Sequence, residues 1–263
     1  MSADDRPLAF SSLGAPGATV AELKEIADAG GIRSVELRCA DGELLAPDTS
    51  LEEARRLGTA LAEAGLHPIC VASYVRIARD DGDPVGEAVA HVRLAEAVGS
   101  PFVRVFGGVE GVAESEEVAA RRLADVAAAI EGSDVTVLIE THDVFLTGAA
   151  LSRILTRAGS DRLGALWDAV NPWRAGESPE ATAAALAPWL RHVQLKDAAG
   201  PTELAPVLPG GGAVPLRGIL EALDGIGYTA AISLEWERAW YPEVAPLPIA
   251  IDAFRGVLAA HSS

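Results

Sequence analysis

The chain has 263 residues, a formal net charge of −17 and only two cysteines. An acidic surface repels phosphate backbones and anionic lipid, so we expect a small-molecule substrate and neither nucleic acid nor a membrane as partner. The N-terminus has no basic segment followed by an apolar one, and no run approaches the roughly 18 apolar residues of a membrane span. These features predict a cytoplasmic protein. We expect Cys39 and Cys70 to be reduced, because two cysteines give no disulfide framework.

The first half of the chain predicts four strands, each followed by a helix. The strands are expected at residues 8–12, 33–38, 67–73 and 102–108. Glu36 and Arg38 lie two residues apart on the second strand, so both side chains should point to the same side. Ser50 is a candidate N-cap for the second helix, and Asp83 followed by Pro84 opens the third.

The second half repeats this alternation. Its strands are expected at residues 135–143, 162–168, 192–198 and 230–237, and the final helix at 247–260. Ser178, Pro179 and Glu180 supply an N-cap, a first-position proline and a first-turn acid for a short helix that ends near Leu190. After the seventh strand comes a run of three glycines, residues 210–212, for which we favour a mobile lid over a phosphate cradle.

Eight alternations of strand and helix predict an α/β fold, a (β/α)8 TIM barrel formed by residues 1–263 as a single domain. An open, doubly wound sheet is the competing fold. It is disfavoured because the first turn lacks the glycine fingerprint of a dinucleotide site and because polar strand ends occur along the whole chain.

Four polar side chains end the last four predicted strands, where a barrel builds its active site. They are Glu140, Asp168, Gln194 and Glu235. Taken singly, each carboxylate could equally cap a helix or pair with an arginine. Taken together, three converging carboxylates would repel one another without a cation, so we predict one bound divalent metal. Oxygen ligands favour Mg²⁺ or Mn²⁺ over zinc.

A second layer follows three of these residues at a spacing of two. It consists of His142, Lys196 and Glu237, which should face the substrate because residues two apart share a strand face. If the chain has already turned into a loop, His142 is instead a satisfied loop histidine. Lys196 has the alternative of an internal ion pair with Asp197.

The tryptophans near the strand ends divide into two groups. Trp167 and Trp236 have the opposite parity to the predicted ligands, which favours packing between barrel and helices. Trp173 and Trp240 follow strand ends in loops and are candidates for a pocket wall.

At these residues the sequence resembles the xylose-isomerase-like superfamily of TIM barrels, which includes sugar and sugar-phosphate isomerases and epimerases, inosose isomerases and dehydratases and, more distantly, zinc endonucleases of the endonuclease IV type. The resemblance is strongest from Leu138 to Glu243, through IETHD, WDAVNPWRAGESPE, HVQLKDA and SLEWERAWYPE. It implies a metal held by Glu, Asp, His and Glu from strands five to eight. Glu140, Asp168 and Glu235 match that pattern.

Two positions depart from the family pattern. Gln194 stands where the family usually has His, and in this the chain is similar to 3-dehydroshikimate dehydratases of the superfamily. Asn171 stands where many members have a substrate-facing His, which argues against a sugar epimerase. The endonuclease branch needs a histidine-rich zinc cluster, and a chain with five histidines does not supply one.

The leading hypothesis is a divalent-metal-dependent isomerase or epimerase acting on a sugar, cyclitol or related hydroxy-carbonyl compound through an enediolate, with Glu140 and Glu235 as acid and base. The expected substrate-binding residues are His142, Lys196, Arg38, Arg104, Asn171, Arg174, Glu237 and Trp240. A dehydratase or lyase of the 3-dehydroshikimate or inosose type is the first alternative, since it shares the first proton abstraction. A non-catalytic barrel that binds a ligand or partner is the second. A homo-oligomer is left open.

Overall fold

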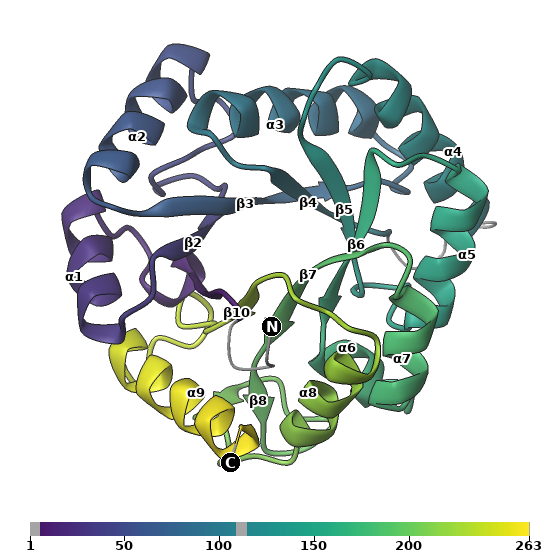
Figure 1. Cartoon of the computed structure of the whole chain (residues 1–263). Coiled ribbons are helices and arrows are strands. Elements are labelled where there is room, and N and C mark those ends of the chain that lie inside the picture. The colour runs from purple at the N-terminus through teal and green to yellow at the C-terminus, as the bar shows by residue number, and fades with distance from the viewer. Residues whose placement is uncertain (1–5, 109–114, 263) are drawn as a thin grey trace.

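The computed structural model describes residues 6–108 and 115–262. Eight parallel strands close into a barrel in the order β1, β10, β7, β6, β5, β4, β3 and β2 (Figure 1). The strands are β1 (Leu8–Ser11), β2 (Ser34–Arg38), β3 (His67–Arg76), β4 (Phe102–Phe106), β5 (Thr136–Glu140), β6 (Leu163–Asp168), β7 (Leu190–Leu195) and β10 (Ile232–Leu234). The predicted (β/α)8 barrel is confirmed.

Helices form a ring outside the strands (Figure 1). They are α1 (Val20–Gly30), α2 (Leu51–Glu63), α3 (Pro84–Val98), α4 (Ser115–Ala129), α5 (Gly148–Ala158), α6 (Val170–Arg174), α7 (Pro179–Leu186), α8 (Leu216–Gly225) and α9 (Leu247–His261), with a short 3-10 helix η2 (Ser12–Gly14). None of the helices in the described part of the chain is long and apolar enough to cross a membrane.

The predicted helix starts are confirmed by their hydrogen bonds. The side chain of Ser50 accepts from the backbone N–H of Glu53, which completes a capping box on α2. Asp83 caps α3, and Ser178 caps α7 ahead of Pro179. The prediction for the end of α7 was wrong by a few residues, because the helix stops at Leu186 and the chain enters β7 at Leu190.

The apolar core lies inside the barrel and between the strands and helices. Trp167 and Trp236 are fully buried in it, as their parity predicted. Cys39 and Cys70 are buried free thiols, as expected. Trp173 packs against this core rather than forming a pocket wall.

The residue at which each strand ends determines which side chains lie at the mouth of the barrel. β3 continues to Arg76, beyond its predicted end, and so carries Tyr74 to the mouth. β5, β7 and β10 end earlier than predicted, at Glu140, Leu195 and Leu234. His142, Lys196 and Glu237 therefore lie in loops. The loop after β7 contains a two-stranded antiparallel sheet, β8 (Asp197–Ala198) with β9 (Pro206–Val207).

Candidate functional site

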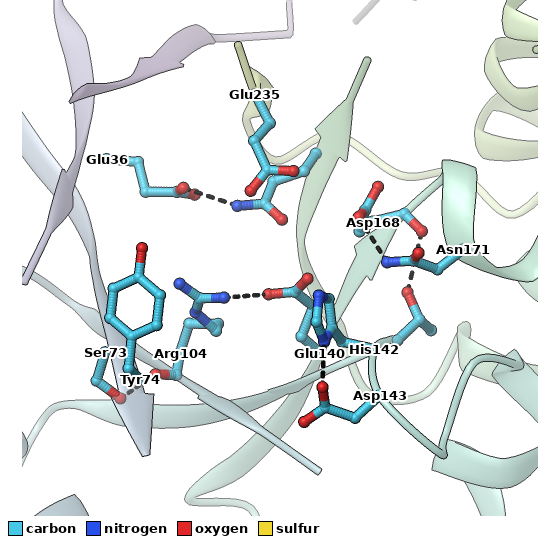
Figure 2. A network of polar contacts seen from close by, with 12 residues as sticks. Glu36, Ser73, Tyr74, Arg104, Glu140, His142, Asp143, Asp168, Asn171 and Glu235 are labelled. Carbon is cyan, nitrogen blue, oxygen red and sulfur yellow. Dashed lines mark hydrogen bonds and ion pairs between the residues drawn. The ribbon is translucent and has the colours of Figure 1, made fainter. Parts of the chain in front are cut away.

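The four predicted metal ligands meet at one end of the barrel and form what we call the polar floor. Glu140 and Asp168 are the last residues of β5 and β6, Gln194 is the next-to-last of β7, and Glu235 follows β10. All four are between 0% and 6% exposed. Figure 2 shows Glu140, Asp168 and Glu235 converging at this end. The fold thus brings together the four side chains that the sequence analysis grouped.

The ammonium group of Lys196 lies among the carboxylates. Its Nζ donates to Glu235 Oε2 at 2.5 Å and to Glu237 Oε1 at 2.7 Å, and lies 3.0 Å from Asp168 Oδ2. Asp168 Oδ2 also accepts from Asn171 Nδ2 at 2.6 Å. Lys196 is therefore the counter-ion of three carboxylates. The alternative ion pair with Asp197 is not formed.

Arg104 supplies the second buried cation. Its Nη1 donates to Glu140 Oε2 at 2.7 Å, as Figure 2 shows. The guanidinium stacks on the Phe106 ring, 3.9 Å from the ring centroid. Arg104 thus holds Glu140 from the β4 side, whereas Lys196 holds Glu235 from the β7 side.

Burial and charge perturb the acids of the floor in different directions. Desolvation raises the pKa of Asp168 to about 7, although the charge of Lys196 acts to lower it. Desolvation also raises the pKa of Glu140, against the influence of Arg104. For Glu235, burial acts in the same direction, but the charge and hydrogen bond of Lys196 prevail and the pKa is lowered. Two neighbouring glutamates thus sit in distinct electrostatic environments.

A buried network beneath the floor was not predicted from the sequence. Glu36 accepts from Gln194 Nε2 at 2.7 Å, and its other oxygen lies 2.8 Å from His192 Nε2. This contact fixes the amide of Gln194, and it leaves Gln194 Oε1 buried with no hydrogen-bond partner in the described chain. The residue spacing could have indicated part of this network, because His192 and Gln194 are two apart on β7 and point to the same side.

A pocket of about 250 Å³ lies above Lys196. Its walls include six of the predicted substrate-binding residues, namely His142, Asn171, Arg174, Lys196, Glu237 and Trp240. Trp240 is 52% exposed and forms part of the rim. The four residues of the polar floor do not line this pocket.

His142 is positioned by a loop contact rather than by a strand. Its Nδ1 lies 2.8 Å from Asp143 Oδ1, and Arg76 Nε donates to the other oxygen at 3.2 Å. Asp143 adopts a positive φ of 52°, which costs backbone energy that these contacts offset. The imidazole also packs on Phe106 at a centroid distance of 4.3 Å.

Arg38 and Arg104 do not line the pocket, in contrast to the other predicted substrate-binding residues. Arg38 Nε donates to the hydroxyl of Tyr74 at 2.8 Å, and its Nη1 donates to Glu43 at 2.6 Å. The guanidinium also lies 4.7 Å from the centroid of the Trp240 ring. Arg38 thus supports the aromatic rim through Tyr74 and Trp240.

The hydrogen bonds of the three glycines after β7 argue against a phosphate cradle, whereas the predicted lid stays a prediction. The buried carboxylate of Asp197 accepts from the backbone N–H groups of Gly210 and Gly212 at 2.9 and 3.0 Å. It also accepts from Ala198 and Val214. Backbone N–H groups that could have bound a phosphate therefore already donate hydrogen bonds to an acceptor within the chain.

The polar floor has the types of ligand that bind a divalent cation, provided that a basic side chain moves away. Three carboxylates and an unpartnered amide oxygen are the ligands that Mg²⁺ and Mn²⁺ prefer. As the side chains stand, no three Asp, Glu, His or Cys of the described residues are grouped to hold a metal ion. Lys196 and Arg104 take up oxygens that ligation would need. The residues fit the cation if Lys196 withdraws, because Arg104 contacts only Oε2 of Glu140 and leaves the other oxygen for a cation.

A closed parallel barrel with polar residues gathered at the carboxyl ends of its strands defines the TIM-barrel class. Within that class the chain belongs to the xylose isomerase-like TIM barrel family, whose sequence profile matches residues 23–257. The predicted resemblance is confirmed. No curated protein matches the chain in sequence.

Several solved structures share the fold. The IOLI protein with a bound zinc atom is 19% identical, with a TM-score of 0.80 and 98% of each chain covered. A probable 3-DHS dehydratase, AsbF from Bacillus anthracis, is 16% identical, with a TM-score of 0.78 over 95% of this chain and 98% of that one. An L-ribulose 3-epimerase is 17% identical, with a TM-score of 0.78 over 97% and 95% of the two chains.

One similar structure is longer than this chain. It is a fusion of a xylose isomerase-like TIM barrel with 4-hydroxyphenylpyruvate dioxygenase, 18% identical with a TM-score of 0.81. The match covers 95% of this chain and 42% of the fusion protein. At such identities the likeness of these structures concerns the fold.

Proposed function

We propose that this protein is an isomerase or epimerase that moves a proton at the carbon next to the carbonyl group of a small sugar, cyclitol or related polyol. The observation that carries the proposal is the pair of buried glutamates in the polar floor, next to the pocket. Glu140 comes from β5 and Glu235 from the end of β10, three strand positions apart around the barrel. Each is held by a separate cation, Arg104 or Lys196.

In this proposal the two glutamates divide the proton transfer between them. One carboxylate removes the proton from the carbon next to the carbonyl, which leaves an enediolate. The other carboxyl group returns a proton to the neighbouring carbon in an isomerisation, in which the hydroxyl proton also passes to the former carbonyl oxygen. In an epimerisation it returns the proton to the opposite face of the same carbon. Their burial keeps water away from the reacting carbon and holds both side chains in one orientation.

A divalent cation would be held by Glu140, Asp168, Gln194 and Glu235, and would supply Lewis-acid stabilisation of the enediolate charge. Glu36 would keep Gln194 Oε1 turned toward that cation by holding the amide nitrogen. His142, Arg174 and Trp240 would bind the remainder of the substrate, because they line the pocket above.

The test is solvent-deuterium exchange. The protein is incubated in D₂O with Mn²⁺ or Mg²⁺ and a panel of free aldoses, ketoses and inososes, and loss of the C–H proton next to the carbonyl is followed by NMR. Glu235→Gln should slow exchange by about 10²- to 10⁴-fold. Glu52→Gln, at a side chain on α2 that is 79% exposed, is the matched control and should keep the wild-type rate.

Two results would contradict the proposal. Exchange at an unchanged rate in Glu235→Gln would show that Glu235 takes no part in the proton transfer. Absence of exchange with every compound, with or without metal, would instead favour a barrel that binds a ligand without catalysis.

A dehydratase is the second candidate. It is favoured by Gln194, which stands where the family resemblance implies a histidine, and by the likeness of the fold to a probable 3-DHS dehydratase. Elimination begins with the same proton abstraction, and the enolate then expels a β-hydroxyl group. A new ultraviolet absorption from a conjugated product would identify elimination, whereas deuterium incorporation without one would identify isomerisation or epimerisation.

A further inference from the structure

Lys196 occupies carboxylate oxygens that a cation bound by the polar floor would need. Its ammonium contacts both Asp168 and Glu235, two of the four residues that would ligate the metal. We infer that Lys196 is a built-in counter-ion that a divalent cation displaces, and that the displaced ammonium remains on Glu237. This inference rests on the proposed function for its set of metal ligands.

The first supporting observation concerns access to the floor. Lys196 and Glu237 line the pocket, whereas Glu140, Asp168, Gln194 and Glu235 do not. Lys196 therefore separates the pocket from the carboxylates. A small molecule in the pocket therefore meets the ammonium, which in turn contacts Asp168 and Glu235 of the floor.

The second observation is the unused acceptor of the floor. Gln194 Oε1 is buried and has no partner among the described residues, although Glu36 holds the amide in a fixed orientation. A buried acceptor without a partner costs about 1–3 kcal/mol. Lys196 is committed to three carboxylate oxygens, so it leaves this acceptor unsatisfied. A cation ligated by the floor would use it.

The third observation is that the ammonium already contacts a carboxylate outside the polar floor, that of Glu237. Glu237 Oε1 lies 2.7 Å from Lys196 Nζ, and the Glu237 side chain is 18% exposed, against 0% for Asp168 and 8% for Glu235. Lys196 follows the last residue of β7 and lies outside any helix or strand. Rotation of the lysine side chain can therefore carry Nζ toward the pocket while the barrel hydrogen bonds stay intact.

The composition of the chain makes this position distinctive. Of its 21 basic residues only Lys24 and Lys196 are lysines, and the rest are arginines. An ammonium is a compact point charge, closer in size to a metal ion than a planar guanidinium is. The same scarcity provides a clean experiment, because Lys24 is on α1, 46% exposed and paired with Asp28.

The first test follows both lysines by NMR in the full-length protein labelled with ¹³C-lysine. Mg²⁺ is titrated into chelator-treated protein, and binding is measured in parallel by calorimetry. We expect the Lys196 side-chain signals to shift with saturation at one equivalent while the Lys24 signals remain in place. One-to-one binding of Mg²⁺ without a shift of the Lys196 signals would overturn the inference.

The second test measures Mn²⁺ affinity in a double-mutant cycle. Lys196→Met removes the competing charge and should tighten binding by at least about tenfold. Glu237→Gln removes the negative charge that holds the displaced ammonium. It should weaken binding severalfold in the chain that has Lys196 and leave binding unchanged in the Lys196→Met chain. Equal effects of Glu237→Gln in both backgrounds would overturn the inference.

Failure of this inference is distinguishable from failure of the proposed function. If neither Mg²⁺ nor Mn²⁺ binds the wild-type chain, nothing displaces Lys196 and the inference is wrong. The deuterium-exchange assay is then repeated without metal. Exchange that depends on Glu235 in that assay would uphold the proposed proton transfer, and its absence would reject both.

Discussion

Asp168 and Asp197 are two buried aspartates whose charges are neutralised in different ways. Asp197 accepts hydrogen bonds from four backbone N–H groups, among them those of Gly210 and Gly212. Asp168 lies in the polar floor and has as counter-ion the ammonium of Lys196, which it shares with Glu235 and Glu237. The first carboxylate organises a loop, and the second belongs to a cluster with more negative than positive charge.

The two environments distinguish a structural acid from one whose counter-ion can be exchanged. Backbone amides are fixed by the chain, so a carboxylate bound to them cannot release its partners without local unfolding. A side-chain ammonium in a loop can leave, and another cation can replace it. Buried acids of the second kind are retained at a cost in stability, which is typical of functional sites.

The largest effect on stability is expected for Asp197→Asn. An asparagine offers one acceptor oxygen, and its NH₂ group would face two of the backbone N–H donors. Leaving these buried donors unpaired should lower the free energy of unfolding by about 3 kcal/mol. Urea unfolding followed by tryptophan fluorescence measures the change. Stability equal to that of the wild type would refute a structural role for Asp197.

A smaller loss of stability is expected for Gly212→Ala. A Cβ atom at this position would lie 2.2 Å from Asp197 Oδ1 and 2.4 Å from the carbonyl oxygen of Ala198, so the loop must shift. We expect a loss of about 2 kcal/mol in the same urea experiment. Gly225→Ala is the control, because nothing lies within 4 Å of a Cβ there. Equal stability of the two variants would show that the glycine loop is not built tightly around Asp197.

The smallest change in stability is expected for Asp168→Asn, although the chemical change is the same as in Asp197→Asn. With the new amide oxygen facing Asn171, only the 3.2 Å hydrogen bond from the Val170 N–H is lost. Lys196 keeps Glu235 and Glu237 as partners, and one repelling charge is removed from the floor. The free energy of unfolding should stay within about 1 kcal/mol of the wild type or rise. Mn²⁺ affinity should nevertheless fall at least about tenfold by calorimetry. A loss of stability as large as that of Asp197→Asn would remove the distinction between the two aspartates.

Most of the fold and half of the site were accessible from the sequence for physical reasons. The alternation of β-branched runs with alanine-rich helices predicts the barrel, and a barrel brings the ends of its strands together. Glu140, Asp168, Gln194 and Glu235 could therefore be grouped without any structure. Side chains that follow a strand end, such as His142 and Glu237, were assigned to the pocket on the assumption of strand parity. They do line it, although from loops.

The remaining contacts depend on distances between atoms that no local pattern encodes. Glu36 is separated from Gln194 by 158 residues, and nothing near either residue indicates the pair. For Lys196, the sequence offered Asp197 as the adjacent partner, but neighbouring residues on an extended segment point to opposite sides. The contact with Asp168, Glu235 and Glu237 is instead set by where the end of β6 and the loops after β7 and β10 place these side chains.

The most direct test of the exchangeable site is a crystal structure of the protein soaked with Mn²⁺, with the metal located by anomalous scattering. We expect a manganese ion bound by Glu140, Asp168, Gln194 and Glu235, with Lys196 Nζ on Glu237 and away from Asp168. A manganese ion located elsewhere, or a Lys196 ammonium still hydrogen-bonded to Asp168 and Glu235 beside the bound metal, would contradict the account.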